Sequence, residues 1–219
     1  ETVGRDAVRQ IATDFGLRGP LAEGPALALG ASEATLINMT GAFAGILNGG
    51  SSVQPYGLLE LRLAGDDVPL MGKGGGIGER VLRESVAQEL IYMMRQVVTR
   101  GSGKRANLPD REVAGKTGTT QAARDAWFIG FTADYVAGVW MGYDDNTPLS
   151  GVTGGSLPAE IWKATMERVH ENVPVRPLPM MRPEEELPGR AFGDEIIETQ
   201  PEPDNDPVLI QILRDLLGG

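Results

Sequence analysis

The chain has 219 residues, enough for one large domain or for one domain with a tail, and its 41% apolar and 23% charged residues are ordinary for a globular protein. It has no cysteine and a single histidine, His170, so the sequence predicts no disulfide framework and no thiolate metal site, and zinc binding would need carboxylates. We expect no metal site and no cofactor. Its net charge of -10 argues against nucleic acid as a partner.

The apolar residues of the first 170 positions recur with helical and strand periods in turn. A helix is predicted around residues 8–15, a second runs to Leu47 after an N-cap at Ser32, and a strand pair follows over 57–71. A third helix is predicted over 82–97. A short strand (112–115), a hairpin (127–131 with 135–141) and a closing helix from Pro158 complete the order. Because no β-helix-β repeat occurs, the sequence predicts an α+β fold in which helices pack on an antiparallel sheet.

The composition changes near residue 171. Residues 171–219 hold 11 acids, 4 bases and 8 of the 15 prolines. The sequence therefore predicts a domain over 1–170 and an acidic, proline-rich, mostly disordered tail over 171–219. The apolar run 208–217 is long enough for a short terminal helix, but a weakly formed apolar end is an equal alternative.

The segment with the clearest chemical character is residues 113–120, Val-Ala-Gly-Lys-Thr-Gly-Thr-Thr, at the end of the predicted short strand. Lys116 supplies a positive point charge. Thr117 and Thr119 fall on one face, because strand side chains repeat every two residues. Gly118 between them lets a ligand approach the backbone. This pattern is typical of a strand edge that binds a carboxylate and an oxyanion together.

Gly115-Lys116-Thr117 could instead end a phosphate-binding loop of a nucleotide hydrolase. The first glycine of that motif would fall at position 110, which is Asp110. The expected order is also strand, loop, helix, whereas a hairpin follows here. This remains a remote alternative.

Four ordered blocks resemble the transpeptidase domain of class A (bifunctional) penicillin-binding proteins. They are residues 28–35 with 48–50, residues 115–120 with 124–128, residues 136–147, and residues 154–159 before 161–162. The likeness spans residues 1 to about 170. It implies the α+β fold of penicillin-binding proteins and serine β-lactamases, incomplete in this chain.

The resemblance also implies a chemistry. The family builds its site from Ser-x-x-Lys, Ser-x-Asn and Lys-Thr-Gly. Its serine is acylated by the D-Ala-D-Ala end of a peptidoglycan stem peptide, a second stem takes the acyl group, and β-lactam antibiotics acylate the same serine. By resemblance Lys116 and Thr119 are catalytic, the backbone N–H of Thr119 serving the oxyanion hole, while Thr117, Gly118 and Thr119 bind the substrate.

The chain departs from the family in one large respect. No serine is followed by Lys three residues later or by Asn two residues later. By resemblance both motifs, a glycosyltransferase domain and a membrane anchor lie upstream of Glu1. The missing N-terminal part would then be a partner, and the chain alone would be inactive. The resemblance places the protein at the periplasmic or outer face of the bacterial inner membrane.

Two further alternatives stay open. One is a non-catalytic domain of the same fold that binds peptidoglycan or a partner protein. The other, ranked lower, is a serine β-lactamase. An upstream Ser-x-x-Lys would favour an enzyme over a binding domain.

Overall fold

The computed structural model describes residues 4–72 and 74–182. The helices and strands of this part are α1 (Arg5–Asp14), the 3-10 helix η1 (Pro25–Leu29), α2 (Leu36–Leu47), β1 (Ser51–Gln54), β2 (Glu60–Leu61), β3 (Met71–Gly72), β4 (Gly76–Arg80), α3 (Glu84–Thr99), η2 (Lys104–Ala106), β5 (Ala114–Thr119), η3 (Gln121–Ala123), β6 (Asp125–Phe131), β7 (Val136–Gly142) and α4 (Leu157–Val169). The predicted mixture of helices and antiparallel strands is confirmed.

The main sheet has the order β5-β6-β7 and is antiparallel throughout. The predicted hairpin is β6 with β7, closed where the N–H of Thr132 donates to the carbonyl of Tyr135 at 3.0 Å. The predicted short strand is longer than its pattern indicated. It continues through Lys116 to Thr119 and pairs with β6 along its whole length. The Lys-Thr-Gly segment therefore lies within an edge strand of the described sheet, not beyond the strand's end.

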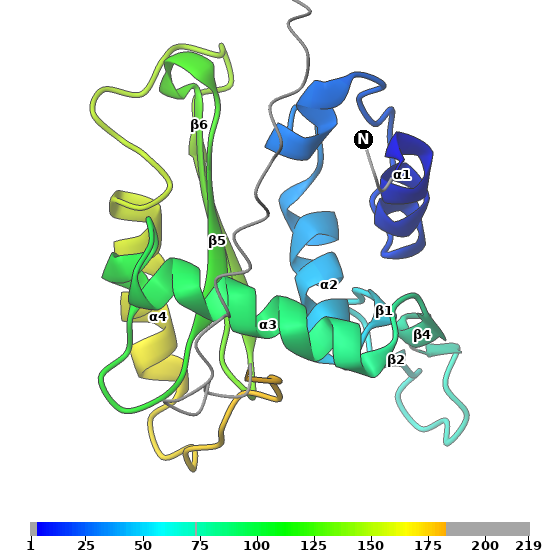
Figure 1. Ribbon diagram of the computed structural model, residues 1–219. Coiled ribbons are helices and arrows are strands. Elements are labelled where there is room, and N and C mark those ends of the chain that lie inside the picture. Colours follow the sequence, from blue (N-terminus) through cyan, green and yellow to red (C-terminus); the bar gives the residue numbers. More distant parts are fainter. Residues whose placement is uncertain (1–3, 73, 183–219) are drawn as a thin grey trace, which may run out of the picture. The chain divides into compact units, whose positions relative to one another are not determined.

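Helices cover both faces of this sheet, α2 on one side and α4 on the other (Figure 1). On the α4 side, Phe128 and Trp162 meet edge to face with ring centroids 5.3 Å apart, and both are fully buried. On the α2 side, Gly138 lies against the side chains of Leu36 and Thr40. Side chains that alternate along β6 and β7 therefore face different helices, one set toward α4 and the other toward α2.

Helix starts agree with the sequence at α4 and differ at α2. Pro158 stands in the first turn of α4, as predicted. The N-cap of α2 is Thr35, whose Oγ1 accepts the N–H of Asn38 at 3.3 Å. Ser32 is not that cap, because its Oγ accepts the N–H of Ala22 at 2.9 Å instead. The predicted strand pair over 57–71 is reduced to two residue pairs between β2 and β3.

Residues 173–182, called the strap below, pack on the domain. The strap lies in the region predicted as tail, and the compact unit extends to Arg182 rather than ending at residue 170. Leu178 is only 5% exposed and is buried with Ile91, Met94, Ala114 and Phe131. The predicted tail beyond Arg182, including the run 208–217, lies outside the described residues.

Polar groups hold the strap at several points. The carboxylate of Glu112 accepts the N–H of Leu178 at 3.0 Å and the Arg182 guanidinium at 2.9 Å. Nearer the start, the buried Arg111 side chain donates to the carbonyl of Val173 at 3.3 Å and to Asp110. The side-chain hydrogen bond from Arg111 lowers the pKa of Asp110. These contacts tie the strap to the segment that leads into β5.

Candidate functional site

The residues that the sequence singled out stand on the open edge of the main sheet. Ala114 and Gly115 are buried at the start of β5, Lys116 and Thr119 are exposed, and Thr117 and Gly118 between them are half-buried. The Nζ of Lys116 donates to the carbonyl of Thr117 at 2.8 Å. Lys116 pairs with Ile129, so the strand's alternation puts its side chain on the face opposite to Thr117 and Thr119. The side chain of Lys116 thus leaves from the other face, but its ammonium returns to the main chain at Thr117 and stands at the strand edge.

Both hydroxyls have partners from distant segments. The Oγ1 of Thr117 lies 2.6 Å from the Oγ of Ser102, in the turn after α3. The Oγ1 of Thr119 accepts the N–H of Gly154 at 3.0 Å. A Cβ at Gly154 would collide with the carbonyl oxygens of Trp127 and Gly118, so only glycine allows this loop to approach β5 so closely.

The sequence had not assigned Ser102 or Gly154 to the site. The signals present were a Gly-Ser-Gly triplet at 101–103 and a Gly-Gly pair at 154–155. Each indicates a close backbone approach but not which strand is approached.

The turn that follows β5 fixes its far end. The Oγ1 of Thr120 accepts the N–H of Asp125 at 2.8 Å, and the indole N–H of Trp140 donates to Asp125 at 2.9 Å. Ala122 and Ala123 have positive φ values of 59° and 51°, a region that costs energy for residues other than glycine. Tertiary contacts therefore hold this turn in a strained form beside the candidate site.

The phosphate-loop alternative does not fit this geometry. Lys116 and Thr117 stand inside a strand, and η3 after Thr120 spans only Gln121–Ala123. No α-helix N-terminus is presented to Lys116 by the residues that directly follow it in the described chain.

His170 is buried at the end of α4 and both of its ring nitrogens are engaged. Nδ1 lies 2.7 Å from the carbonyl of Met166 and must donate to it, because a carbonyl only accepts. Nε2 lies 2.8 Å from the hydroxyl oxygen of Thr132. This arrangement joins α4 to the β6–β7 turn and gives His170 a structural role.

The acidic stretch at 144–145 forms a turn. The carboxylate of Asp145 accepts the backbone N–H of Thr147 at 3.0 Å. Hydrogen bonding from Thr147, first through its side chain and then through its backbone, lowers the pKa of Asp145. No group of three or more His, Cys, Asp and Glu side chains suited to a metal ion occurs in the part of the chain that the structure describes. Within residues 4–72 and 74–182, no helix is both long and apolar enough to cross a bilayer.

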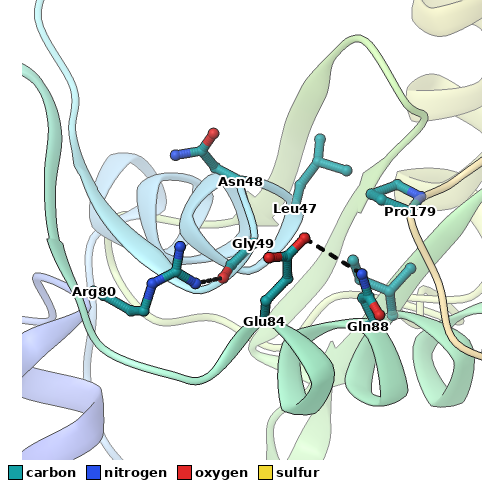
Figure 2. Close-up of a pocket in the computed structure, with 8 residues that line it drawn as sticks. Leu47, Asn48, Gly49, Arg80, Glu84, Gln88 and Pro179 are labelled. Atoms are coloured by element: carbon teal, nitrogen blue, oxygen red, sulfur yellow. Dashed lines mark hydrogen bonds between the residues drawn. The ribbon is translucent and has the colours of Figure 1, made fainter.

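Two cavities lie apart from β5. Figure 2 shows one of about 230 Å³, between the end of α2, the first turns of α3 and Pro179 of the strap. Arg80 donates to the carbonyl of Gly49 at 2.7 Å at its rim. The second, of about 290 Å³, is lined by residues 108–111 and the end of α4. Neither has a β5 residue in its lining.

The family described as the penicillin-binding protein transpeptidase domain matches residues 12–167. Penicillin-binding protein 1A of Aquifex aeolicus is 34% identical over 175 residues, which cover 80% of this chain and 24% of that protein. The crystal structure of penicillin-binding protein 1A from Haemophilus influenzae superposes with a TM-score of 0.70 at 26% identity, over 81% of this chain and 32% of that one. Penicillin-binding protein A of M. tuberculosis, solved as an imipenem acyl-enzyme complex, has a TM-score of 0.62 at 25% identity, over 78% of this chain and 44% of that one.

The chain thus spans about a quarter of the length of that curated relative. The family match includes the whole of β5 with Lys116, Thr117 and Thr119, and it ends before the strap. The open strand edge, the two helix-covered sheet faces and this match together identify the chain as a member of the transpeptidase domain family of class A penicillin-binding proteins.

Proposed function

We propose that the chain is the C-terminal part of the transpeptidase domain of a longer serine D,D-transpeptidase. The observation that carries the proposal is the exposed edge of β5, which presents Lys116, Thr117 and Thr119 in a chain of this family. In the proposal, this edge is the wall of the site that binds the carboxylate of a D-Ala-D-Ala stem peptide.

The reaction proposed is acyl transfer through a serine that lies outside these 219 residues, since no Ser-x-x-Lys occurs in them. The serine oxygen attacks the carbonyl of the penultimate D-Ala, the peptide C–N bond breaks, and D-Ala leaves with a proton on its amine. The amine of a second stem peptide then attacks the ester and releases the serine.

Each residue of the edge has a proposed part in this reaction. Lys116 supplies positive potential for the anionic substrate and for the developing oxyanion. The Thr117 and Thr119 hydroxyls donate to the carboxylate, and Gly118 leaves the backbone accessible between them. The backbone N–H of Thr119 donates to the oxyanion.

The same proposal gives the protein β-lactams as inhibitors and the outer face of the bacterial membrane as its place of action. Support for the first comes from the M. tuberculosis relative, which was solved as an imipenem acyl-enzyme. Peptidoglycan stem peptides are the substrate in this proposal, and the upstream part of the same protein supplies the nucleophile.

Labelling with a fluorescent penicillin tests the proposal. The full-length protein is expected to take up about one covalent label that survives boiling, and the chain of residues 1–219 alone is expected to take up none. An unlabelled full-length protein whose upstream sequence contains Ser-x-x-Lys would contradict the proposal.

One observation favours a second candidate, a non-catalytic peptidoglycan- or partner-binding domain of the same fold. The 219 residues contain neither the Ser-x-x-Lys nor the Ser-x-Asn motif. A full-length sequence without both motifs, together with the absence of penicillin labelling, would establish this alternative over the enzyme.

A further inference from the structure

We propose that Ser102 is a positioning residue, which orients the hydroxyl of Thr117 so that this hydroxyl donates to a bound carboxylate. The inference rests on the proposed function, because it concerns the carboxylate wall of the same site. It starts from the two hydrogen bonds that the side chains of Thr117 and Thr119 make, one with Ser102 and one with Gly154.

The Thr119 hydroxyl shows the principle. A hydroxyl has one proton to donate and two lone pairs that accept. The backbone N–H of Gly154 can only donate, so the Oγ1 of Thr119 must accept in this contact. The Thr119 hydroxyl can therefore donate its own proton to a ligand at the open edge of β5.

The Thr117 hydroxyl must also donate its proton to the ligand, but its hydrogen-bond partner is a side-chain hydroxyl rather than a backbone N–H. Its Oγ1 lies 2.6 Å from the Oγ of Ser102, and either hydroxyl can be the donor of that bond. A carboxylate bound at the open edge of β5 can only accept hydrogen bonds, so the Thr117 hydroxyl must donate its proton to that carboxylate. Ser102 must then donate to Thr117, and the three groups form a chain in which each hydrogen bond polarises the next.

The backbone holds Ser102 firmly in this place. The N–H of Gly103 donates to the carbonyl of Val97 at 2.9 Å, which fixes the turn to the last turn of α3. On the other side, a Cβ at Gly155 would collide with the carbonyl oxygen of Ser102. Ser102 is thus set between α3 and the loop that also supports Thr119. Thr117 and Thr119 thus contact two neighbouring segments, one through the exposed Ser102 and the other through the buried Gly154.

The test uses the full-length protein, with N-acetyl-D-alanine as the carboxylate probe and N-acetyl-D-alaninamide as the probe without a charge. Saturation-transfer NMR gives the dissociation constant of each. Ser102→Ala is expected to weaken binding of the acid about tenfold, since hydrogen bonds to charged groups are among the stronger ones. Binding of the amide is expected to change less than twofold.

A double-mutant cycle separates positioning through Thr117 from a general loss of structure. In a Thr117→Val background, Ser102→Ala is expected to cause no further loss of acid binding, because the hydroxyl on which it acts is gone. Ser102→Thr keeps a hydroxyl and is expected to restore most of the affinity. Ser52→Ala, which removes one hydrogen bond to the carbonyl of Glu79 in the β1–β4 pair, is the matched control and should leave binding unchanged.

The outcomes separate this inference from the proposed function when penicillin labelling is measured beside the NMR. Wild-type labelling with Ser102→Ala binding the acid as tightly as wild type would overturn the inference and leave the function standing. Acid binding that depends on Ser102 in a protein that penicillin does not label would remove the function and keep the inference. Equal losses for acid and amide, additive losses in the cycle, or no acid binding by wild type would each refute the role of Ser102.

Discussion

At the scale of single residues, the site depends on small side chains where two segments meet. Gly154 lets a loop reach the backbone of β5, and Gly138 lets α2 reach the sheet. A Cβ at Gly138 would lie 2.5 Å from the Oγ1 of Thr40 and 2.8 Å from the Leu36 side chain. The sheet that presents Lys116 is therefore supported from beneath by a contact that has no room for one more methyl group.

Gly138→Ala is expected to lower the free energy of unfolding by about 1–3 kcal/mol, because overpacking forces α2 away from β7. Gly57→Ala is the matched control, since a Cβ at Gly57 meets nothing within 4 Å, and it should change stability by less than about 0.5 kcal/mol. Urea unfolding of both variants measures the difference. Equal stability of the two variants would contradict this prediction, because it would show that the contact between α2 and the sheet can accommodate an additional methyl group.

Part of the site follows from local sequence and part does not. The common face of Thr117 and Thr119 follows from the two-residue period of a strand. The positive charge at Lys116 follows from the residue type alone. The hydrogen-bond partners of the two threonines could not be predicted, because Ser102 and Gly154 are 15 and 35 residues from the threonines that they contact. Only tertiary packing brings them together.

At the scale of elements, strong periodicity predicted α2, α3, α4 and the β6–β7 hairpin. The extent of β5 was missed because Gly118 and Lys116 have low strand propensity. The strand forms nevertheless because β6 offers a partner for every residue of it.

The strap was also missed by the sequence analysis. Its proline content indicates an extended and unfolded chain, but an extended chain can still bury one side chain, and Leu178 does so.

Truncation distinguishes the strap from the tail beyond it. A full-length protein that ends at Glu171 is expected to melt several degrees lower than wild type, because Leu178 and the Glu112 contacts are lost. A protein that ends at Arg182 keeps these contacts and is expected to melt several degrees higher than the one that ends at Glu171. Leu178→Ala should lower the free energy of unfolding by about 2–4 kcal/mol. Val175→Ala is the control at a strap position that is 57% exposed. Identical melting of the two truncations would mean that the strap contributes nothing to stability.

At the scale of the whole molecule, the described unit leaves two apolar surfaces uncovered. Helix α1 has no buried residue, and Val8 and Ile11 on its apolar face are about two-fifths exposed. In the β2–β3 hairpin, Leu59, Leu61 and Leu63 alternate with polar residues and are all exposed. Surfaces of this kind normally pack against other protein. In the longer transpeptidase proposed above, we expect upstream chain to cover these two surfaces.

The central claim is that the Lys116 edge of β5 is the anion-binding wall of an acylation site, and the acylation rate of Lys116 variants tests it most directly. In the full-length protein, Lys116→Ala is expected to slow penicillin acylation by a factor on the order of 10² or more, because the lost charge acts on the developing oxyanion. Its free energy of unfolding should change by no more than about 1 kcal/mol, since the side chain is exposed. Lys116→Arg should recover only part of the rate, because the planar guanidinium places its charge elsewhere. A folded Lys116→Ala protein that is acylated at the wild-type rate would contradict the account.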